Sequence, residues 1–277
     1  MRSIGALARS SHPGPVLIVT LIEVLLGIAV GLEPWRVLVL GLTLGFNQLS
    51  IGLSNDWIDA RRDIAAGRTD KPIARGDVTP HLVRNVALAC GGLAIGVSLA
   101  LGFPFAVAHL IAIAGGWAYN LWLKSSALSF VPYLVSFGLL PLLATLARPV
   151  AAGAAWWAIA AGALLGLAAH IANVLPDLSA DVATGVRGMP HRVGLRVASV
   201  IAGLALAAAA LALVVGIGVS PISTAGLALS LAASAASVVF GLRRSRAAFP
   251  LVMLAAVMDV VLLVVAGSRM VASPFGG

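Results

Sequence analysis

Charged residues are scarce in this sequence, and their scarcity excludes an ordinary soluble protein. Only 10% of the 277 residues are Asp, Glu, Lys or Arg, whereas 60% are hydrophobic, and the mean hydropathy is +1.05. A soluble domain carries roughly 25% charged residues because its surface faces water. Most of the surface of this chain must therefore face lipid, and we predict an integral membrane protein. Cysteine is also scarce: the single thiol, Cys90, excludes an intramolecular disulfide and a multi-cysteine metal site.

Long apolar runs, in contrast, recur along nearly the whole chain. A helix needs about 20 apolar residues to cross a bilayer. The first run follows Arg2 and Arg9 without a convincing small-residue cleavage site, so we predict a spanning helix there and not a signal peptide. We predict an all-α fold of nine transmembrane helices in one domain, residues 1–277, with eight helices as the alternative. The predicted spans are 16–32, 35–54, 82–101, 104–123, 127–147, 154–176, 193–217, 221–241 and 249–271.

The basic residues, which give a net charge of +8, are distributed unevenly across these spans. Nine crossings place 15 of the 18 Lys and Arg residues on the side of the N-terminus and leave only Arg36, Arg148 and Arg269 on the other side. The positive-inside rule then puts the N-terminus and the basic loops in the cytoplasm, with the C-terminus across what we expect to be a prokaryotic plasma membrane. The positive charge is explained by topology, and no nucleic-acid partner is predicted.

Two polar connections, near 55–81 and 177–192, hold seven of the ten acidic residues. Both share the spacing N-x3-D-x3-D-x3-G-x4-P, and an arginine follows soon after each glycine. The offset between them spans four predicted helices, so both connections emerge on the same face, as in two four-helix halves with one added helix. The matched residues are Asn55, Asp59, Asp63, Gly67 and Pro72 in the first motif, and Asn173, Asp177, Asp181, Gly185 and Pro190 in the second.

Steps of four residues keep side chains near one face of a helix. Each motif is therefore predicted to be the cytoplasmic end of a helix that stops at its glycine. Facing carboxylates repel one another unless a cation neutralises them, and all-oxygen ligands favour Mg²⁺ or Ca²⁺. The five candidate carboxylates are Asp56, Asp59, Asp63, Asp177 and Asp181.

Positive side chains lie in or near the same connections, namely Arg68, Lys71, Lys124 and Arg187. Mg²⁺ bound by one or two carboxylates keeps coordination positions for substrate phosphate. We infer a site where metal ions join aspartates to a diphosphate whose apolar tail lies between helices. Isoprenyl diphosphates have this chemistry.

Simpler interpretations stay open. The acids are also compatible with a solvated loop, and each arginine with a topology signal alone. A cation-binding transporter or channel fits the parallel repeat, although transporters place charged sites near the midplane, and a non-catalytic lipid-binding scaffold is a third class.

Polar residues within spans serve either function or helix–helix hydrogen bonding; they are Glu23, Asn47, Gln48, His109, His170 and Asp259.

The segments NDWIDARRD, GRTDKPIARG and NVLPDLSADVATGVRGMPHRVG resemble the signature regions of the UbiA superfamily of intramembrane prenyltransferases. The family pattern N-D-x-x-D-x-x-x-D is matched from Asn55 to Asp63, and D-x-x-x-D is matched by Asp177 and Asp181. Lys71 replaces the second arginine of an R-T-x-x-R-P-like tail, and Gly188-Met189-Pro190 replaces a T-L-P-like run.

The resemblance implies helices around a central cavity and Mg²⁺-dependent transfer of a prenyl group, within the bilayer, from an isoprenyl diphosphate to a hydrophobic or aromatic acceptor. It assigns the five carboxylates to metal–diphosphate binding and Tyr119 to the allylic cation or the acceptor. The residues expected to contact the diphosphate or substrate are Asn55, Arg68, Lys71, Lys124, Asn173 and Arg187.

Overall fold

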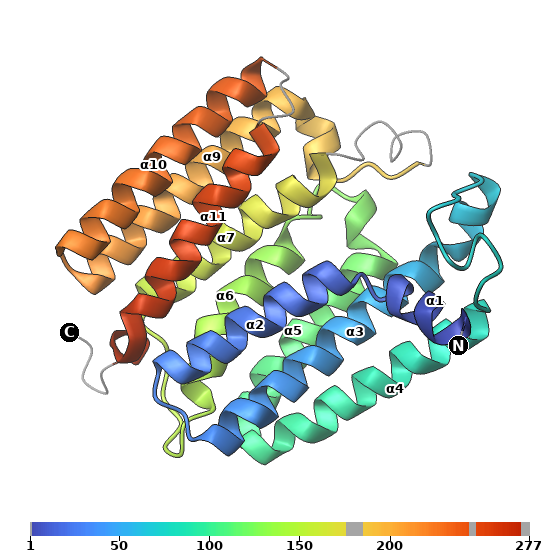
Figure 1. The fold of residues 1–277 in the computed structure, drawn as a ribbon, viewed down its shortest axis with the longest axis horizontal. Helices are drawn as coiled ribbons and strands as arrows, with labels where there is room; N and C mark the ends of the chain where they lie inside the picture. Colours follow the sequence, from blue (N-terminus) through green and yellow to red (C-terminus); the bar gives the residue numbers. More distant parts are fainter. Residues whose placement is uncertain (1, 176–184, 244–247, 273–277) are drawn as a thin grey trace.

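The structure, a computed structural model, describes residues 2–175, 185–243 and 248–272 as a bundle of α-helices (Figure 1). Within these residues, a helix occupies each of the nine predicted spans, and a short helix, α1 (Arg2–Ser10), precedes them. The 3-10 turns η1 (Leu99–Leu101), η2 (Leu123–Ser125) and η4 (Gly267–Met270) follow three of the helices. The long helices are α2 (Pro13–Ala29), α3 (Pro34–Ala65), α4 (Pro80–Ser98), α5 (Phe103–Leu121), α6 (Val131–Leu146), α7 (Trp156–Val174), α9 (Met189–Ile217), α10 (Pro221–Leu242) and α11 (Ala248–Ala266).

Proline sets the start of many of these helices. The first residues of α2, α3, α4 and α10 are Pro13, Pro34, Pro80 and Pro221. Proline suits the first turn because the N–H it lacks would have no partner inside the helix, and because its fixed φ is already helical. At α10 a capping box supports the same boundary, since the side chains of Ser220 and Ser223 each bond the other's backbone N–H.

The lengths and composition of the helices confirm an integral membrane protein. In the described part of the chain, six helices are long and apolar enough to cross a bilayer: α3, α4, α7, α9, α10 and the stretch from Pro250 to Met270. The α1–α2 pair, bent by 66°, makes a seventh if it counts as one span, and α6 is a shorter apolar helix. The number of nine crossings stays a prediction.

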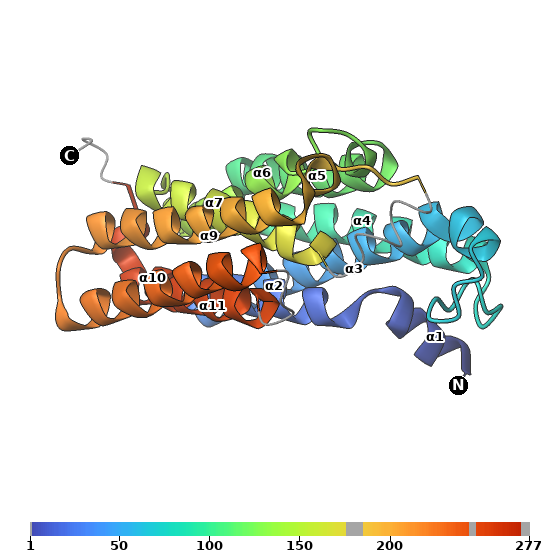
Figure 2. The same cartoon turned by 90° about the horizontal axis from the view of Figure 1, so that it is seen from above.

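The helices pack in the order that two similar halves require. In the first half α3 packs between α2 and α4, and in the second half α7 packs between α6 and α9. The added helix, α11, closes the bundle against α2, α7, α9 and α10. Figure 2 shows α1 extending beyond the bundle at the end where the segment after α3 lies, and η4 lies at the opposite end (Figure 1).

Small residues allow close helix contacts, as membrane bundles commonly require. A Cβ on Gly166 of α7 would lie 2.3 Å from the Tyr133 carbonyl oxygen of α6, and a Cβ on Gly162 would lie 2.5 Å from that of Phe137. The contact between α3 and α5 is softer, because a Cβ on Gly116 would meet the Ile51 side chain at 2.3 Å. At these positions the α6–α7 contact therefore brings backbone against backbone, whereas the α3–α5 contact brings backbone against a side chain.

Two of the three basic residues that the sequence places apart from the others, Arg36 and Arg269, bind helix ends. Arg36 Nη1 donates to the carbonyl oxygen of Ala147, the C-cap residue of α6, at 2.9 Å. The Arg269 guanidinium donates to the carbonyl oxygen of Ile217, the last residue of α9. A cation at a helix C-terminus satisfies free carbonyls and opposes the helix dipole. An isolated bridge between Ala154 and Val271 ties the C-terminal segment down nearby.

Candidate metal and diphosphate site

The first motif lies on the last turns of α3, as the spacing predicts. The helix continues beyond the predicted span to Ala65, so Asn55, Asp56, Asp59 and Asp63 are all helical. Gly67 then adopts φ of +64°, and the next backbone N–H, that of Arg68, bonds the Asp63 carbonyl oxygen at 3.0 Å. A positive φ is the ordinary glycine ending of a helix, so the prediction of a helical stripe is confirmed for this motif.

The three carboxylates of this stripe are buried, which makes the solvated-loop interpretation wrong for them. Asp56 is 2% exposed, Asp59 is 7% exposed and Asp63 is 4% exposed. Burying a charge is costly unless the charge is paired and hydrogen-bonded, and partners are present for each carboxylate. Their cationic partners are Lys71 Nζ, 2.7 Å from Asp56 Oδ1; Lys124 Nζ and Arg62 Nη2 (2.8 Å) on Asp59; and Arg62 Nε, 3.9 Å from Asp63 Oδ1.

Lys71 and Lys124 reach the carboxylates from two different connections. Lys71 belongs to the segment after α3, and Lys124 lies in η2 after α5. Burial lowers the pKa of the Lys124 ammonium, while the Asp59 carboxylate acts in the opposite direction. Both predicted diphosphate-binding lysines are therefore at the first motif, on its carboxylates.

Asn55 joins the motif to α5 through a residue that the sequence does not single out. Its Nδ2 donates to Asn120 Oδ1 at 3.1 Å, and Asn120 Nδ2 donates to Ser54 Oγ at 2.8 Å and to the Ile51 carbonyl oxygen at 2.9 Å. Asn120 is 2% exposed. In the sequence, the one feature that could have drawn attention to it is an asparagine beside Tyr119 at the end of a largely apolar run. This network fixes the end of α3 relative to the end of α5.

Arg68 is placed differently from the two lysines. Its Nε and Nη2 donate to Asp70 at 2.8 and 2.7 Å in the exposed connection after α3. These hydrogen bonds lower the pKa of the Asp70 carboxyl to about 2. The structure therefore shows the Arg68 guanidinium on Asp70, and its predicted contact with diphosphate stays a prediction.

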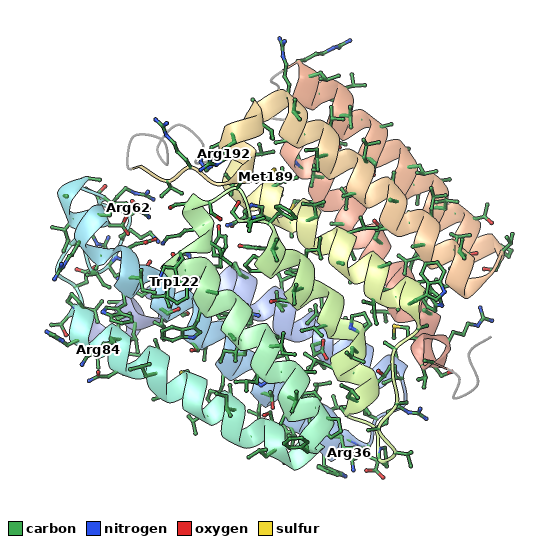
Figure 3. All side chains as sticks on the ribbon, turned by 180° about the vertical axis from the view of Figure 1, so that it is seen from behind. Arg36, Arg62, Arg84, Trp122, Met189 and Arg192 are labelled. Atoms are coloured by element: carbon green, nitrogen blue, oxygen red, sulfur yellow. The ribbon has the colours of Figure 1, made fainter. Side chains whose placement is uncertain are left out.

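The second motif is described only in part. Asn173, on the last turn of α7, is exposed, and its Nδ2 donates to Tyr133 Oη at 3.4 Å. Asp177 and Asp181 lie outside the described residues, so whether they face the first motif stays a prediction. Arg187 is exposed, and its carbonyl oxygen accepts from Arg192 Nε at 3.0 Å. Figure 3 shows Arg192 and Met189 toward the same end of the bundle as Arg62, away from Arg36.

Ser129, two residues before α6, holds the exit of the second motif in place. Its Oγ accepts from the Met189 backbone N–H at 2.8 Å and lies 3.0 Å from His170 Nε2 on α7. A Cβ on the preceding Gly188 would lie 2.7 Å from the Lys124 carbonyl oxygen, so this close approach requires glycine. The segment that leaves the second motif thus packs directly on the turn that carries Lys124.

Three rings meet where the end of α5, the start of α6 and the end of α7 come together. The Tyr119 ring of α5 lies 5.2 Å from that of Tyr133 on α6 and 5.9 Å from that of His170 on α7, and Tyr133 and His170 are 5.0 Å apart between ring centroids. Tyr119 and Tyr133 meet edge to face, a favourable aromatic geometry. Aromatic faces also attract cations. Tyr133 and Ser129 were not predicted, because neither belongs to a repeated spacing.

The residues present fit a hard divalent cation. In the described part of the chain, no three His, Cys, Asp or Glu side chains are arranged as a complete metal site, and the aspartates of the second motif lie outside that part. Asp56 Oδ2 is nevertheless buried and has no hydrogen-bond partner among the described residues. A carboxylate oxygen without a donor is the kind of ligand that Mg²⁺ and Ca²⁺ prefer.

The polar residues within spans are buried, except Gln48, which is partly buried. Glu23 and Asp259 are both 0% exposed, in α2 and α11. The His109 ring stacks on Phe105 at 6.2 Å, as expected of a structural histidine. A hollow of about 230 Å³ lies between α4 and α5, against Gly91, Gly92 and Trp117, and no charged residue lines it. The central cavity stays a prediction.

The sequence matches one family model and a curated relative. The family model described as the UbiA prenyltransferase family matches residues 16–252. A curated protein named digeranylgeranylglyceryl phosphate synthase, from Methanopyrus kandleri, is 33% identical over 156 residues, which are 53% of this chain and 56% of the relative. The similarity thus spans just over half the length of that relative.

Solved structures share the fold along nearly the whole chain. One, from work on digeranylgeranylglyceryl phosphate synthase in membranes, has a TM-score of 0.70 at 12% identity and covers 97% of this chain and 99% of its own. A UbiA homologue from Archaeoglobus fulgidus bound to DMAPP and Mg²⁺ has a TM-score of 0.71 at 14% identity, covering 94% and 99%. At these identities the likeness shows the fold alone.

Proposed function

The chain belongs to the UbiA prenyltransferase family, and from that premise we propose that it transfers a prenyl group from an isoprenyl diphosphate to an acceptor within the membrane. One observation carries the proposal: three buried aspartates on one helix end, each paired with a cation from the protein. So many buried charges are unusual in so apolar a chain. A ligand that combines Mg²⁺ with phosphate oxygens matches both: the metal ion suits the aspartates, and the phosphate oxygens suit the cationic side chains.

The aspartates and the cations have complementary tasks in this proposal. Mg²⁺, when bound, neutralises charge on the departing diphosphate. Asp56, Asp59 and Asp63 would hold it from α3, and Asp177 and Asp181 would hold it from the second motif. The diphosphate oxygens are bound by Asn55, Arg68, Lys71, Lys124, Asn173 and Arg187.

The bond that breaks joins the first carbon of the prenyl group to a diphosphate oxygen, and its electron pair leaves with the diphosphate. Positive charge at the binding site stabilises the charge that develops on that oxygen. The Tyr119 ring faces the allylic cation left behind. The apolar bundle excludes water until a nucleophilic atom of the acceptor forms the new bond and loses its proton.

The acceptor is the least constrained element. The name of the Methanopyrus kandleri relative implies a glycerophosphate lipid, so we propose that acceptor class first and an aromatic acceptor second. We further propose that residues 1–277 form one domain in a prokaryotic plasma membrane. The N-terminus and both motifs face the cytoplasm, on the charge distribution described above.

The direct test incubates the purified protein in lipid vesicles with labelled geranyl, farnesyl and geranylgeranyl diphosphates and with both acceptor classes. Mass spectrometry of the lipids then identifies a prenylated product. We expect EDTA to abolish product formation and Mg²⁺ to restore it. Product formation that is insensitive to EDTA would contradict the metal role, and no product from any donor would contradict the enzyme assignment.

A further inference from the structure

His12 has an unusual backbone conformation. Its φ of 56° and ψ of 67° are left-handed, and among the described residues it is the only one other than glycine with positive φ. Such a conformation costs a non-glycine residue on the order of 1 kcal/mol and persists only where its surroundings hold it. It occurs at the bend between α1 and α2, where the two helix axes differ by 66°.

The bend is pressed onto α3, one turn before the first aspartate of the motif. A Cβ on Gly52 would lie 2.1 Å from the Ser11 carbonyl oxygen, so only glycine allows this approach. The α1 helix is fixed beside it, because Ala6 is 0% exposed and belongs to an apolar cluster with Leu53 and Ile73. The backbone around His12 is therefore held in place from both sides.

The His12 side chain points at the candidate site. Its Nε2 lies 3.2 Å from Asp56 Oδ1 and 3.3 Å from Lys71 Nζ. Lys71 Nζ donates to the same carboxylate oxygen at 2.7 Å. Both contacts therefore fall on Oδ1, and the buried Oδ2 is the atom without a hydrogen-bond partner among the described residues.

We propose that His12 is a positioning residue that orients the Asp56 carboxylate so that Oδ2 is directed to the metal. The inference rests on the function proposed above. With its proton on Nε2, the imidazole donates to Oδ1 and fixes the rotation of the carboxylate. Carboxylates that bind metals are commonly oriented by such hydrogen bonds, and their loss typically weakens metal affinity 10- to 100-fold. The strained backbone is what brings the imidazole within reach.

The test measures Mg²⁺-dependent binding of inorganic pyrophosphate to the detergent-purified protein by calorimetry, with thermal unfolding measured in parallel. We expect His12→Ala to weaken apparent Mg²⁺ affinity about 10-fold or more. His12→Gly should lose as much affinity while unfolding at a higher temperature than His12→Ala, because glycine relieves the positive φ. His12→Asn should retain more affinity than His12→Ala, since asparagine tolerates this conformation and donates a hydrogen bond. His81→Ala, at an exposed position of α4, is the matched control and should bind as wild type does.

The outcomes separate the two proposals. Wild-type protein that binds pyrophosphate with Mg²⁺, together with His12 variants of unchanged affinity, would overturn the role of His12 alone. Normal affinity in His12→Gly with weakened affinity in His12→Ala would also overturn it, because the loss would then follow backbone strain and not the imidazole. Wild-type protein without Mg²⁺-dependent binding would overturn the metal site and, with it, this inference.

Discussion

The two motif-bearing helices, α3 and α7, share a sequence spacing but end at different points within it. On α3 the helix runs through the whole first motif to Ala65, and its three aspartates are buried among cations. On α7 the helix ends at Val174, so Asn173 is the last motif residue it carries. The reason is visible in the sequence, because Pro176 falls inside the second motif and cannot donate the hydrogen bond that continues a helix.

This difference teaches that the two copies of the spacing are held in the fold by different contacts. The first motif is part of a long helix that is tied to α5 by Asn120. The second motif is fixed at its exit, where Ser129 bonds Met189. A repeat in sequence therefore does not require that both helices continue equally far into the repeated motif.

The largest expected effect comes from removing one carboxylate from each motif. If both motifs hold the metal, Asp59→Asn and Asp177→Asn should each reduce turnover at least about 100-fold, because each removes a charge that the metal–diphosphate complex needs. Turnover is measured as labelled prenyl product per inserted protein. Asp77→Asn, in an exposed pair with Arg9, is the control and should stay within about twofold. Full activity in Asp177→Asn would leave α3 as the only functional copy.

A second comparison concerns two helix contacts, α6 with α7 and α3 with α5. Gly166→Ala should destabilise the protein by up to about 3 kcal/mol, because the new Cβ meets backbone of α6 that cannot move aside. Gly116→Ala should cost clearly less, since the Ile51 side chain can change rotamer. Thermal unfolding in detergent compares the two variants. Equal losses would show that the α3–α5 contact is as rigid as the α6–α7 contact.

A third prediction compares the asparagines that brace the two motifs. Asn120→Ala should lower stability by about 1–2 kcal/mol, because the Asn55 amide loses its buried acceptor. Asn173→Ala removes one long hydrogen bond at an exposed position and should change stability by less than about 0.5 kcal/mol. The same unfolding assay applies. The reverse order would mean that the second motif depends on Asn173 for its structure.

The smallest effect concerns the exposed pair after α3. The folded pKa of Asp70 is lowered from 3.8 to about 2, so its pairing with Arg68 stabilises the protein above pH 4 and is lost as pH falls through about 2. Solvent and salt screen the pair, which limits the effect to at most about 1 kcal/mol. Asp70→Asn should therefore flatten the change in unfolding temperature between pH 4 and pH 2. An unchanged pH profile would contradict the pairing.

Much of this architecture follows from local sequence patterns. Apolar runs located the nine long helices among the described residues, because lipid imposes one requirement on every span. The four-residue spacing placed Asp56, Asp59 and Asp63 on one helix face. Helix starts were missed by a few residues at α2 and α9. Hydropathy does not respond to a proline such as Pro13 or to the non-helical φ of 79° at Gly194, which separates the first turn of α9 from its main part.

The residues that brace the site could not be predicted in this way. Asn120, Ser129 and Tyr133 act through contacts with residues 40 to 69 positions away. No spacing records such a contact, since it arises only when separate helices pack. His12 was missed for the same reason, and its backbone conformation is one that no histidine adopts by preference.

The helix-end contacts of Arg36 and Arg269 give these two residues a structural role in addition to any effect on membrane topology. Each guanidinium donates a hydrogen bond to a carbonyl oxygen at a helix terminus. These two are therefore partly cancelled by the dipoles they cap, and they present less free charge to lipid headgroups. We expect Arg36→Gln to weaken the bundle, because the Ala147 carbonyl oxygen loses a charged donor, without reversing the insertion of the chain.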